Sequence, residues 1–146
     1  GAYLEFHKIR WPGGLRFWRV TARDADLGDK APYDPLAARL TARAHAHDFA
    51  ELLGEIAGER SGSASLITAP FDTELFGHWW FEGPDFLADL YAALPGVPRL
   101  RAVTAGEHLA RHATRVSTKL VRGSWGRDGD YSMWFNERVQ AMWPVI

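Results

Sequence analysis

The 146-residue sequence contains no cysteine, which excludes disulfide bonds and thiolate metal sites. No apolar run reaches the ~18 residues that a helix needs to cross a bilayer, and the first residues lack the basic-then-apolar pattern of a signal peptide. The chain also lacks an excess of charge of either sign, since its net charge is −1 and its acidic and basic residues are interspersed. Nucleic-acid binders, in contrast, usually carry a basic stripe. We therefore expect no membrane and no nucleic-acid partner, and a cytoplasmic location.

Tryptophan is abundant, with seven residues at positions 11, 18, 79, 80, 125, 134 and 143. Large aromatic residues often serve only as core. Four of these, however, lie among glycines and polar residues, which favours the wall of a binding site: Trp79, Trp80, Trp125 and Trp134. Flat rings of this kind stack on sugar rings, so the sequence favours a carbohydrate ligand.

Helices are indicated at three places by start signals. Asp34 followed by Pro35 predicts a helix that continues to about residue 58, with Leu36, Leu40, His47, Leu52, Leu53 and Ile56 at roughly helical spacing. Gly83-Pro84 predicts a second helix through Leu94, with an apolar face that includes Phe86, Leu87, Leu90 and Tyr91. Thr104 and Glu107 form a capping-box sequence that predicts a third helix.

Strands are predicted between these helices, at residues 13–22, 65–72 and 100–103, from their β-branched, aromatic and apolar content. Residues 123–131 are rich in glycine and predict a loop, after which Asn136 offers a cap for a terminal helix at residues 137–143. The alternation of strands and helices favours an α/β fold. The strands are too few for a complete sheet, and the chain begins without methionine, so we expect it to be part of a longer polypeptide.

Residues 71–83 hold the densest set of chemically useful side chains. Asp72 lies at the end of the predicted strand at residues 65–72, the end that carries the chemistry in α/β folds, although an aspartate there can also simply cap a turn. Glycoside cleavage needs two carboxyl groups and aromatic platforms. Asp72 and Glu74 would project from one face of a strand, with their Cα atoms under ~7 Å apart. Parallel side chains of this kind are poorly placed to flank a glycosidic bond from opposite sides. We expect the partner of Asp72 elsewhere, and surface or ion-pair roles for Glu74 and Glu82.

The histidines offer weaker candidates. His78 stands in a loop with glycines, where it can bind a sugar hydroxyl or make a structural contact, and Trp79 beside it is a candidate for substrate binding. His108 and His112 are four residues apart on the predicted third helix and could meet a metal from one face, but no third ligand has a matching position. The acidic glycine-rich run at 126–130 lacks the ligand order of a calcium loop. We expect no metal and no cofactor.

The segment PFDTELFGHWWFEGPDFL, residues 70–87, resembles the fourth conserved region of glycoside hydrolase family 57. Two further segments match in order: residues 123–134 resemble the family's fifth region, and residues 3–21 resemble a segment of its branching enzymes. The resemblance implies that Asp72 is the acid/base of a retaining mechanism and that Trp125 and Trp134 line the glucan-binding cleft. The nucleophilic glutamate of the family lies in an earlier region, which no segment of this chain resembles.

The resemblance also implies a fold and an activity. Residues 1–113 would be the last strands and helices of a distorted (β/α)7 barrel, and residues 114–146 the incomplete start of a helical C-terminal domain. The implied enzyme is a 1,4-α-glucan branching enzyme of glycogen biosynthesis that acts on amylose or glycogen-like α-glucan, with the nucleophile supplied by the remainder of the same enzyme. The alternatives are a 4-α-glucanotransferase or α-amylase of the family, a non-catalytic carbohydrate-binding module, or an interaction module with exposed aromatics.

Overall fold

The computed structural model describes residues 1–6, 16–22, 24–59, 66–112 and 116–145. The chain divides into two compact units, Gly1–Val103 and Thr104–Ile146. Three α-helices are present in the described residues: α1 (Pro35–Glu59), α2 (Gly83–Ala93) and α3 (Ala105–Arg111). No helix among these ranges is long and apolar enough to span a membrane. The assignment of residues 1–113 and 114–146 to a barrel and a helical domain stays a prediction.

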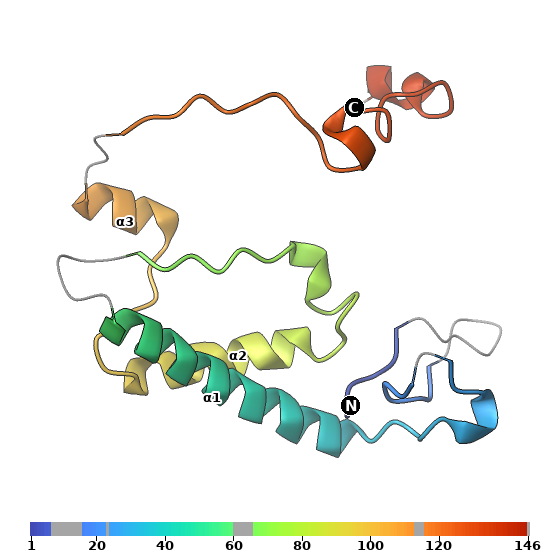
Figure 1. The fold of residues 1–146 in the computed structure, drawn as a ribbon, viewed down its shortest axis with the longest axis vertical. Coiled ribbons are helices and arrows are strands. Elements are labelled where there is room, and N and C mark those ends of the chain that lie inside the picture. Colours follow the sequence, from blue (N-terminus) through green and yellow to red (C-terminus); the bar gives the residue numbers. More distant parts are fainter. Residues whose placement is uncertain (7–15, 23, 60–65, 113–115, 146) are drawn as a thin grey trace. The chain divides into compact units, whose positions relative to one another are not determined.

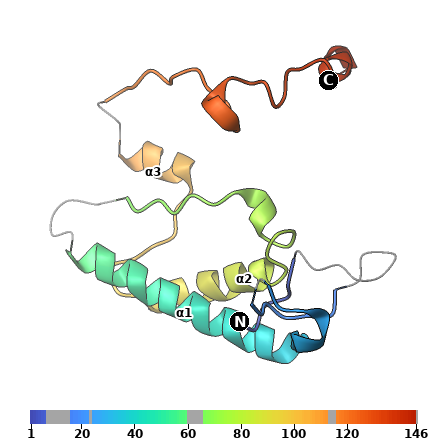
Figure 2. The ribbon, with the colours of Figure 1, turned by 45° about the vertical axis from the view of Figure 1, so that its right-hand side comes forward.

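The first unit is organised by α1 and α2, which lie side by side with their N-terminal ends at the same end of the pair (Figures 1 and 2). The start of α1 is the predicted one: Pro35 is its first residue, and one carboxylate oxygen of Asp34 accepts hydrogen bonds from the Leu36 and Ala37 amides at 2.9 and 3.1 Å. Helix α2 also begins as predicted, with Pro84 in its first turn, and a short 3-10 helix at Leu94–Gly96 follows it.

The fully buried face of α1 is formed by residues other than those that gave the predicted spacing. Four alanines spaced four residues apart are 0 to 1% exposed: Ala38, Ala42, Ala46 and Ala50. Of the residues that gave the predicted helical spacing, Leu36 is 68% and Leu40 59% exposed, while Leu53 is partly buried against the core. Small side chains let two helix axes approach closely, and α2 supplies the bulk from its own side through Phe86 and Leu90. The helix was predicted correctly, but the spacing used for the prediction did not identify the fully buried alanines.

Charged residues tie the two helices together beside this core. The Arg39 guanidinium on α1 donates hydrogen bonds to both carboxylate oxygens of Asp89 on α2, and its Nε lies 3.6 Å from Asp85. The hydrogen bonds from Arg39 hold the pKa of the Asp89 carboxyl below its usual range. The pair therefore adds a pH-dependent contact to the apolar packing of α1 on α2.

The N-terminal residues form a small paired region instead of a sheet. The segment 16–22 pairs on one side with Leu4, through a bridge at Arg19, and on the other with Pro32, through a bridge at Trp18. These are isolated bridges, so the strand predicted at residues 13–22 is not formed in its described part, residues 16–22. Residues 13–15 lie outside the described residues.

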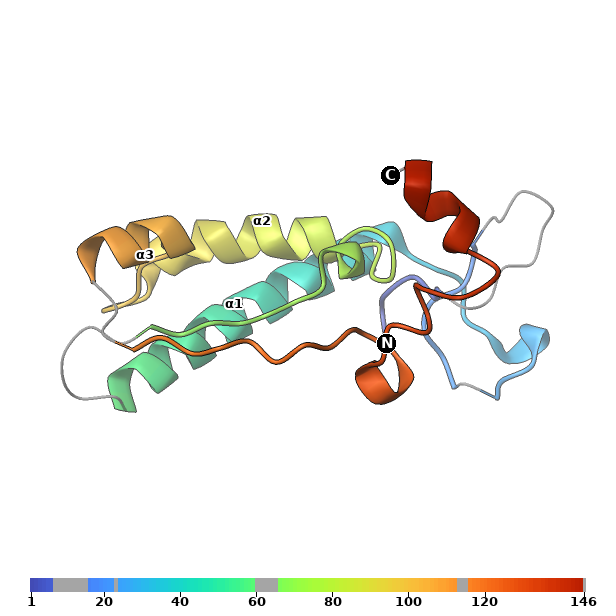
Figure 3. The ribbon, with the colours of Figure 1, turned by 90° about the horizontal axis from the view of Figure 1, so that it is seen from above.

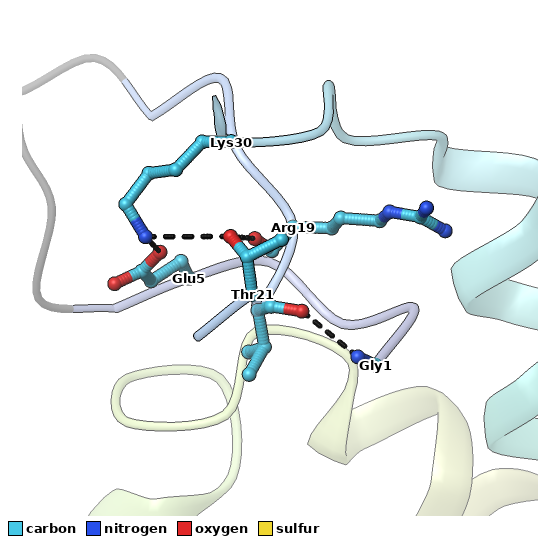
Figure 4. Close-up of polar contacts among 6 residues, drawn as sticks. Gly1, Glu5, Arg19, Thr21 and Lys30 are labelled. Carbon is cyan, nitrogen blue, oxygen red and sulfur yellow. Dashed lines mark hydrogen bonds and ion pairs between the residues drawn. The ribbon is translucent and has the colours of Figure 1, made fainter. Parts of the chain in front are cut away.

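A buried ion pair holds this region closed (Figure 4). Lys30 Nζ lies 2.6 Å from Glu5 Oε2, with the lysine side chain 0% and the glutamate side chain 11% exposed. The same ammonium group donates to Thr21 Oγ1 at 3.3 Å. Breaking one partner of such a pair would leave an uncompensated buried charge, so the pair fixes residues 1–6 against the segment before α1.

The other two predicted strands are also not formed among the described residues. Residues 66–72 run extended along the helix pair, from the C-terminal end of α1 to the N-terminal end of α2 (Figures 1 and 3), yet belong to no sheet, and neither do residues 100–103. A strand needs a neighbouring strand to satisfy its backbone groups, and the described residues supply only isolated bridges. Two parallel helices joined by an extended segment agree with an α/β unit, but the sheet expected for the α/β class is absent from the described ranges.

The second unit begins with the predicted capping box. Thr104 Oγ1 accepts from the Glu107 amide at 3.2 Å, the Glu107 carboxylate accepts from the Thr104 amide at 2.8 Å, and α3 follows. The predicted terminal helix at 137–143 is wrong in type and bounds, because a 3-10 helix occupies Gln140–Val145 instead. Asn136 does cap this region, since its side-chain oxygen accepts from the Arg138 amide at 2.9 Å. Pro144 lies inside the 3-10 helix and cannot donate to it.

Candidate active-site loop

Asp72 is the last residue of the extended segment and directly precedes a 3-10 turn, Thr73–Leu75. Its backbone is extended, with φ −65° and ψ 131°, and its carbonyl accepts from the Leu75 amide at 3.0 Å. The carboxylate is exposed and makes no capping hydrogen bond to this turn. The turn-capping alternative therefore does not describe the Asp72 side chain, which is left available for another partner.

The loop after Asp72 is closed by its own backbone. Trp80 accepts from Gly77 at 2.8 Å and donates to Leu75 at 2.8 Å. Gly77 adopts φ 90°, a left-handed conformation that glycine tolerates. Gly83 lets α2 approach the loop closely, because a Cβ there would lie 2.8 Å from the Phe76 Cα. The loop therefore holds Asp72 on a fixed backbone between the extended segment and α2.

Adjacent tryptophans in this loop face different surroundings. The Trp80 ring is partly buried and packs against Phe86 and Tyr3, with ring centroids at 4.9 and 5.2 Å, so it is a core residue. Trp79 is 47% exposed and lies against Phe6, with ring centroids 4.2 Å apart. Of the two, only Trp79 presents a ring on which a sugar could stack.

His78 lies beside this exposed tryptophan. Its ring is 5.4 Å from the Trp79 ring and 5.3 Å from that of Phe6, and it is itself exposed. The guanidinium of Arg16 covers Phe6 at 4.5 Å from the ring centroid. His78 and Trp79 of the loop that follows Asp72, together with Phe6 and Arg16 from the N-terminal residues, thus form one aromatic and cationic surface, here called the aromatic shelf.

The two glutamates of the loop differ. Glu74 is exposed, as one of the two expected roles requires, but Glu82 is only 3% exposed, so the surface alternative is wrong for it. The ion pairs found among the described residues do not involve Glu82 either. Glu82 Oε1 accepts a hydrogen bond from the Leu4 amide at 2.9 Å, and Oε2 is buried as well. Burial, and then hydrogen bonding to the Glu82 carboxylate, raise the pKa of Tyr33. The burial of Glu82 has no direct signal in the sequence; the one clue is that Glu82 directly precedes the helix start at Gly83-Pro84.

The second unit carries the other two predicted binding residues. Trp125 is 70% and Trp134 is 51% exposed, so neither is core. Trp134 also anchors the C-terminal turn, since its carbonyl accepts from the Trp143 indole at 2.8 Å. The role of both rings as stacking surfaces stays a prediction.

The loop that displays Trp125 is fixed by hydrogen bonds. Ser124 accepts from the Tyr131 amide through its hydroxyl at 2.8 Å and donates its own amide to the Gly129 carbonyl at 3.1 Å. Gly126, with φ 121°, packs where a Cβ would lie 3.1 Å from the Met133 sulfur. A fixed backbone lowers the entropy lost when a ligand stacks on the ring.

The structure brings His108 and His112 together, with ring centroids 4.8 Å apart. No group of three or more His, Cys, Asp or Glu side chains able to hold a metal is found in the part of the chain that the structure describes. The pair therefore stays a two-histidine contact on α3.

No protein-family model matches the chain. A 1,4-alpha-glucan branching enzyme from Thermococcus kodakarensis is 37% identical over 99% of this chain, which covers 22% of that protein. The crystal structure of a GH57-type branching enzyme from Pyrococcus horikoshii matches with a TM-score of 0.74 and 38% identity, over 99% of this chain and 27% of that one. The novel alpha-amylase AmyC from Thermotoga maritima matches with a TM-score of 0.69 and 30% identity, over 77% of this chain and 26% of its own.

The chain is homologous to carbohydrate-active enzymes over nearly its whole length. More specifically, it is homologous to glycoside hydrolase family 57 branching enzymes, which confirms the resemblance to that family. The chain spans 22% of the Thermococcus protein and 27% of the Pyrococcus chain.

Proposed function

We propose that residues 1–146 form part of the active site of a retaining α-glucan transglycosidase, a 1,4-α-glucan branching enzyme, in which Asp72 is the general acid/base. The observation that carries the proposal is the exposed carboxylate of Asp72 at the start of a backbone-closed loop that also carries His78 and Trp79 of the aromatic shelf. The homology to branching enzymes over 99% of the chain supports the same conclusion.

In this reaction the Asp72 carboxyl gives its proton to the oxygen of an α-1,4 link while a second carboxylate attacks the anomeric carbon. The bond to the leaving chain breaks, and the donor chain stays on the enzyme as a glycosyl ester. The ionised Asp72 then takes the proton of an acceptor 6-hydroxyl, which attacks the same carbon and releases the enzyme. Trp79 and His78 would hold the glucan beside the reacting bond, and Trp125 and Trp134 would stack on further glucose units.

The second carboxylate belongs, in this proposal, to a further segment of the active protein. Glu74 follows Asp72 by two residues on the same loop, and Glu82 is buried against Leu4, so neither is placed to flank the glycosidic bond opposite Asp72. We propose that residues 1–113 complete a (β/α)7 barrel with that segment, that residues 114–146 begin a helical domain, and that the enzyme branches glycogen-like glucan in the cytoplasm.

The test replaces Asp72 by Asn in a polypeptide that joins residues 1–146 to the remaining segments of a family 57 enzyme. Branching of amylose is followed by loss of iodine staining and by new α-1,6 links. We expect Asp72→Asn to lower kcat by roughly 10²–10⁴-fold while glucan binding persists. Asp48→Asn, an exposed aspartate on α1, is the matched control and should leave kcat unchanged. Near-normal branching by Asp72→Asn would refute the assignment.

A second measurement separates the alternatives. Release of reducing ends without new α-1,6 links would indicate an amylase, and new α-1,4 links without branches would indicate a 4-α-glucanotransferase. Residues 1–146 assayed alone should show neither cleavage nor transfer, because a retaining mechanism needs two carboxyl groups about 5–5.5 Å apart. Turnover by residues 1–146 alone would mean that Glu74 or Glu82 acts as the nucleophile.

A further inference from the structure

Glu82 is a buried carboxylate for which the proposed reaction has no use. It is 3% exposed and lies in the same loop as Asp72, directly before α2. Oε1 accepts a hydrogen bond from the Leu4 amide, Oε2 is also buried, and the Tyr33 side chain interacts with the same carboxylate. Taking a carboxylate out of water is unfavourable unless its neighbours compensate for the lost hydration, so the contacts that surround Glu82 call for an explanation.

The partner of Glu82 lies far away in the sequence. The Leu4 amide donates to Glu82 Oε1 at 2.9 Å across 78 residues. The residues on each side of Leu4 also contact the loop: Tyr3 packs on Trp80 at 5.2 Å between ring centroids, and Phe6 packs on Trp79 at 4.2 Å. The hydrogen bond from Leu4 is therefore the polar centre of a contact that lays residues 3–6 across the loop.

Residues 3–6 also contact residues outside the loop. Leu4 bridges to Arg19, and Glu5 makes the buried ion pair with Lys30 shown in Figure 4. Tyr3 donates to or accepts from His45 on α1 at 2.7 Å. The segment is thus a fixed support, and Glu82 is the point at which the active-site loop is attached to it through a polar group.

We propose that Glu82 is a positioning residue, whose Oε1 fixes the loop of Asp72 and Trp79 against residues 3–6 and thereby places the acid/base for glycosyl transfer. This inference rests on the proposed function of Asp72. Orientation of a catalytic group matters because a displacement of about 1 Å can lower the rate by roughly 10²-fold. In this role the length and orientation of the Glu82 side chain matter, because they bring Oε1 to the Leu4 amide. The negative charge of the carboxylate is not required.

Two conservative variants separate reach from charge. Glu82→Gln keeps an oxygen at the position of Oε1 and removes the charge, whereas Glu82→Asp keeps the charge and withdraws the acceptor by one methylene. In the joined polypeptide we expect Glu82→Asp and Glu82→Ala to lower kcat at least 10-fold with KM changed less than 3-fold, and Glu82→Gln to retain at least a third of kcat. Glu55→Ala, an exposed glutamate on α1, is the control.

A second readout does not depend on turnover. Hydrogen exchange at the Leu4 amide should be at least 10-fold faster in Glu82→Ala and Glu82→Asp than in the unchanged chain, and protected in Glu82→Gln. Activity is normalised to the folded fraction at each measurement. This separates a positioning role from simple loss of folded protein, and Glu82→Gln keeps the test valid if Glu82→Ala does not fold.

The outcomes are distinguishable from failure of the proposed function. If Asp72→Asn abolishes turnover but Glu82→Asp and Glu82→Ala keep kcat within 2-fold, the positioning role is wrong and the function of Asp72 stands. If Glu82→Gln loses kcat while Glu82→Asp keeps it, charge is what matters and the proposal is overturned. If Asp72→Asn remains active, the proposed function fails and the positioning role fails with it.

Discussion

Replacing each of the adjacent tryptophans Trp79 and Trp80 by alanine should have opposite effects on stability and on glucan binding. Full burial makes a Trp→Ala change cost about 3–5 kcal/mol, and Trp80 is partly buried against Phe86 and Tyr3, so we expect a loss of roughly 2–4 kcal/mol in unfolding free energy. Trp79 is 47% exposed and contacts Phe6, which limits the loss to about 0.5–1.5 kcal/mol.

For glucan affinity we expect the opposite order, with a larger loss in Trp79→Ala than in Trp80→Ala. A ring that stacks on a sugar contributes on the order of 1 kcal/mol, so Trp79→Ala should weaken maltooligosaccharide binding about 5-fold. Trp80→Ala should leave affinity unchanged at temperatures where the protein is folded. Urea unfolding gives the stabilities, and calorimetric titration of the joined polypeptide gives the affinities.

Equal losses of stability in the two variants would contradict the structure, which assigns only the Trp80 ring to the core. An unchanged affinity in Trp79→Ala would show that the aromatic shelf has no part in glucan binding. The pair is a matched experiment, because both residues have the same chemistry and neighbouring backbone positions.

Three further predictions follow from the packing and the exposed rings. Ala46→Leu should destabilise the chain by about 1–3 kcal/mol in urea unfolding, because Ala46 is 0% exposed, whereas the exposed Ala44→Leu should change little. Asp89→Asn should lower the urea midpoint at pH 7; because the folded pKa of Asp89 is lowered, its contribution is present above the unfolded value near 4 and is lost as pH falls further, so the two midpoints should converge in acid. Trp125→Ala and Trp134→Ala should each weaken oligosaccharide binding by on the order of 1 kcal/mol and change the melting temperature little, a result that core packing of either ring would contradict.

Helix starts could be predicted from the sequence because their signals are local. Asp34 caps α1 from within three residues, and Thr104 and Glu107 exchange hydrogen bonds across a single turn. Strands depend on partners that are distant in sequence, so residues 66–72 could be predicted as extended but not as paired.

The buried face of α1 shows a second limit. Helical spacing is satisfied both by leucines such as Leu36 and Leu40, which are exposed, and by the alanines at positions 38, 42, 46 and 50, which are buried. Hydrophobicity favours the leucines, but the close approach of α2 selects the alanines, and the distance between two helices is not a property of either helix sequence.

The candidate site likewise combines features set by nearby residues, which could be predicted, with features set by distant residues, which could not. The loop from Asp72 to Gly83 closes through hydrogen bonds between residues a few positions apart, such as Trp80 to Leu75, so its shape is determined by its own sequence. A resemblance that is centred on residues 70–87 could therefore identify Asp72 as the candidate acid/base. What supports the loop comes from residues 3–6, and Glu82 meets Leu4 across 78 residues. Its burial could not be predicted from the local sequence, because a glutamate before a Gly-Pro helix start is exposed unless a distant segment covers it.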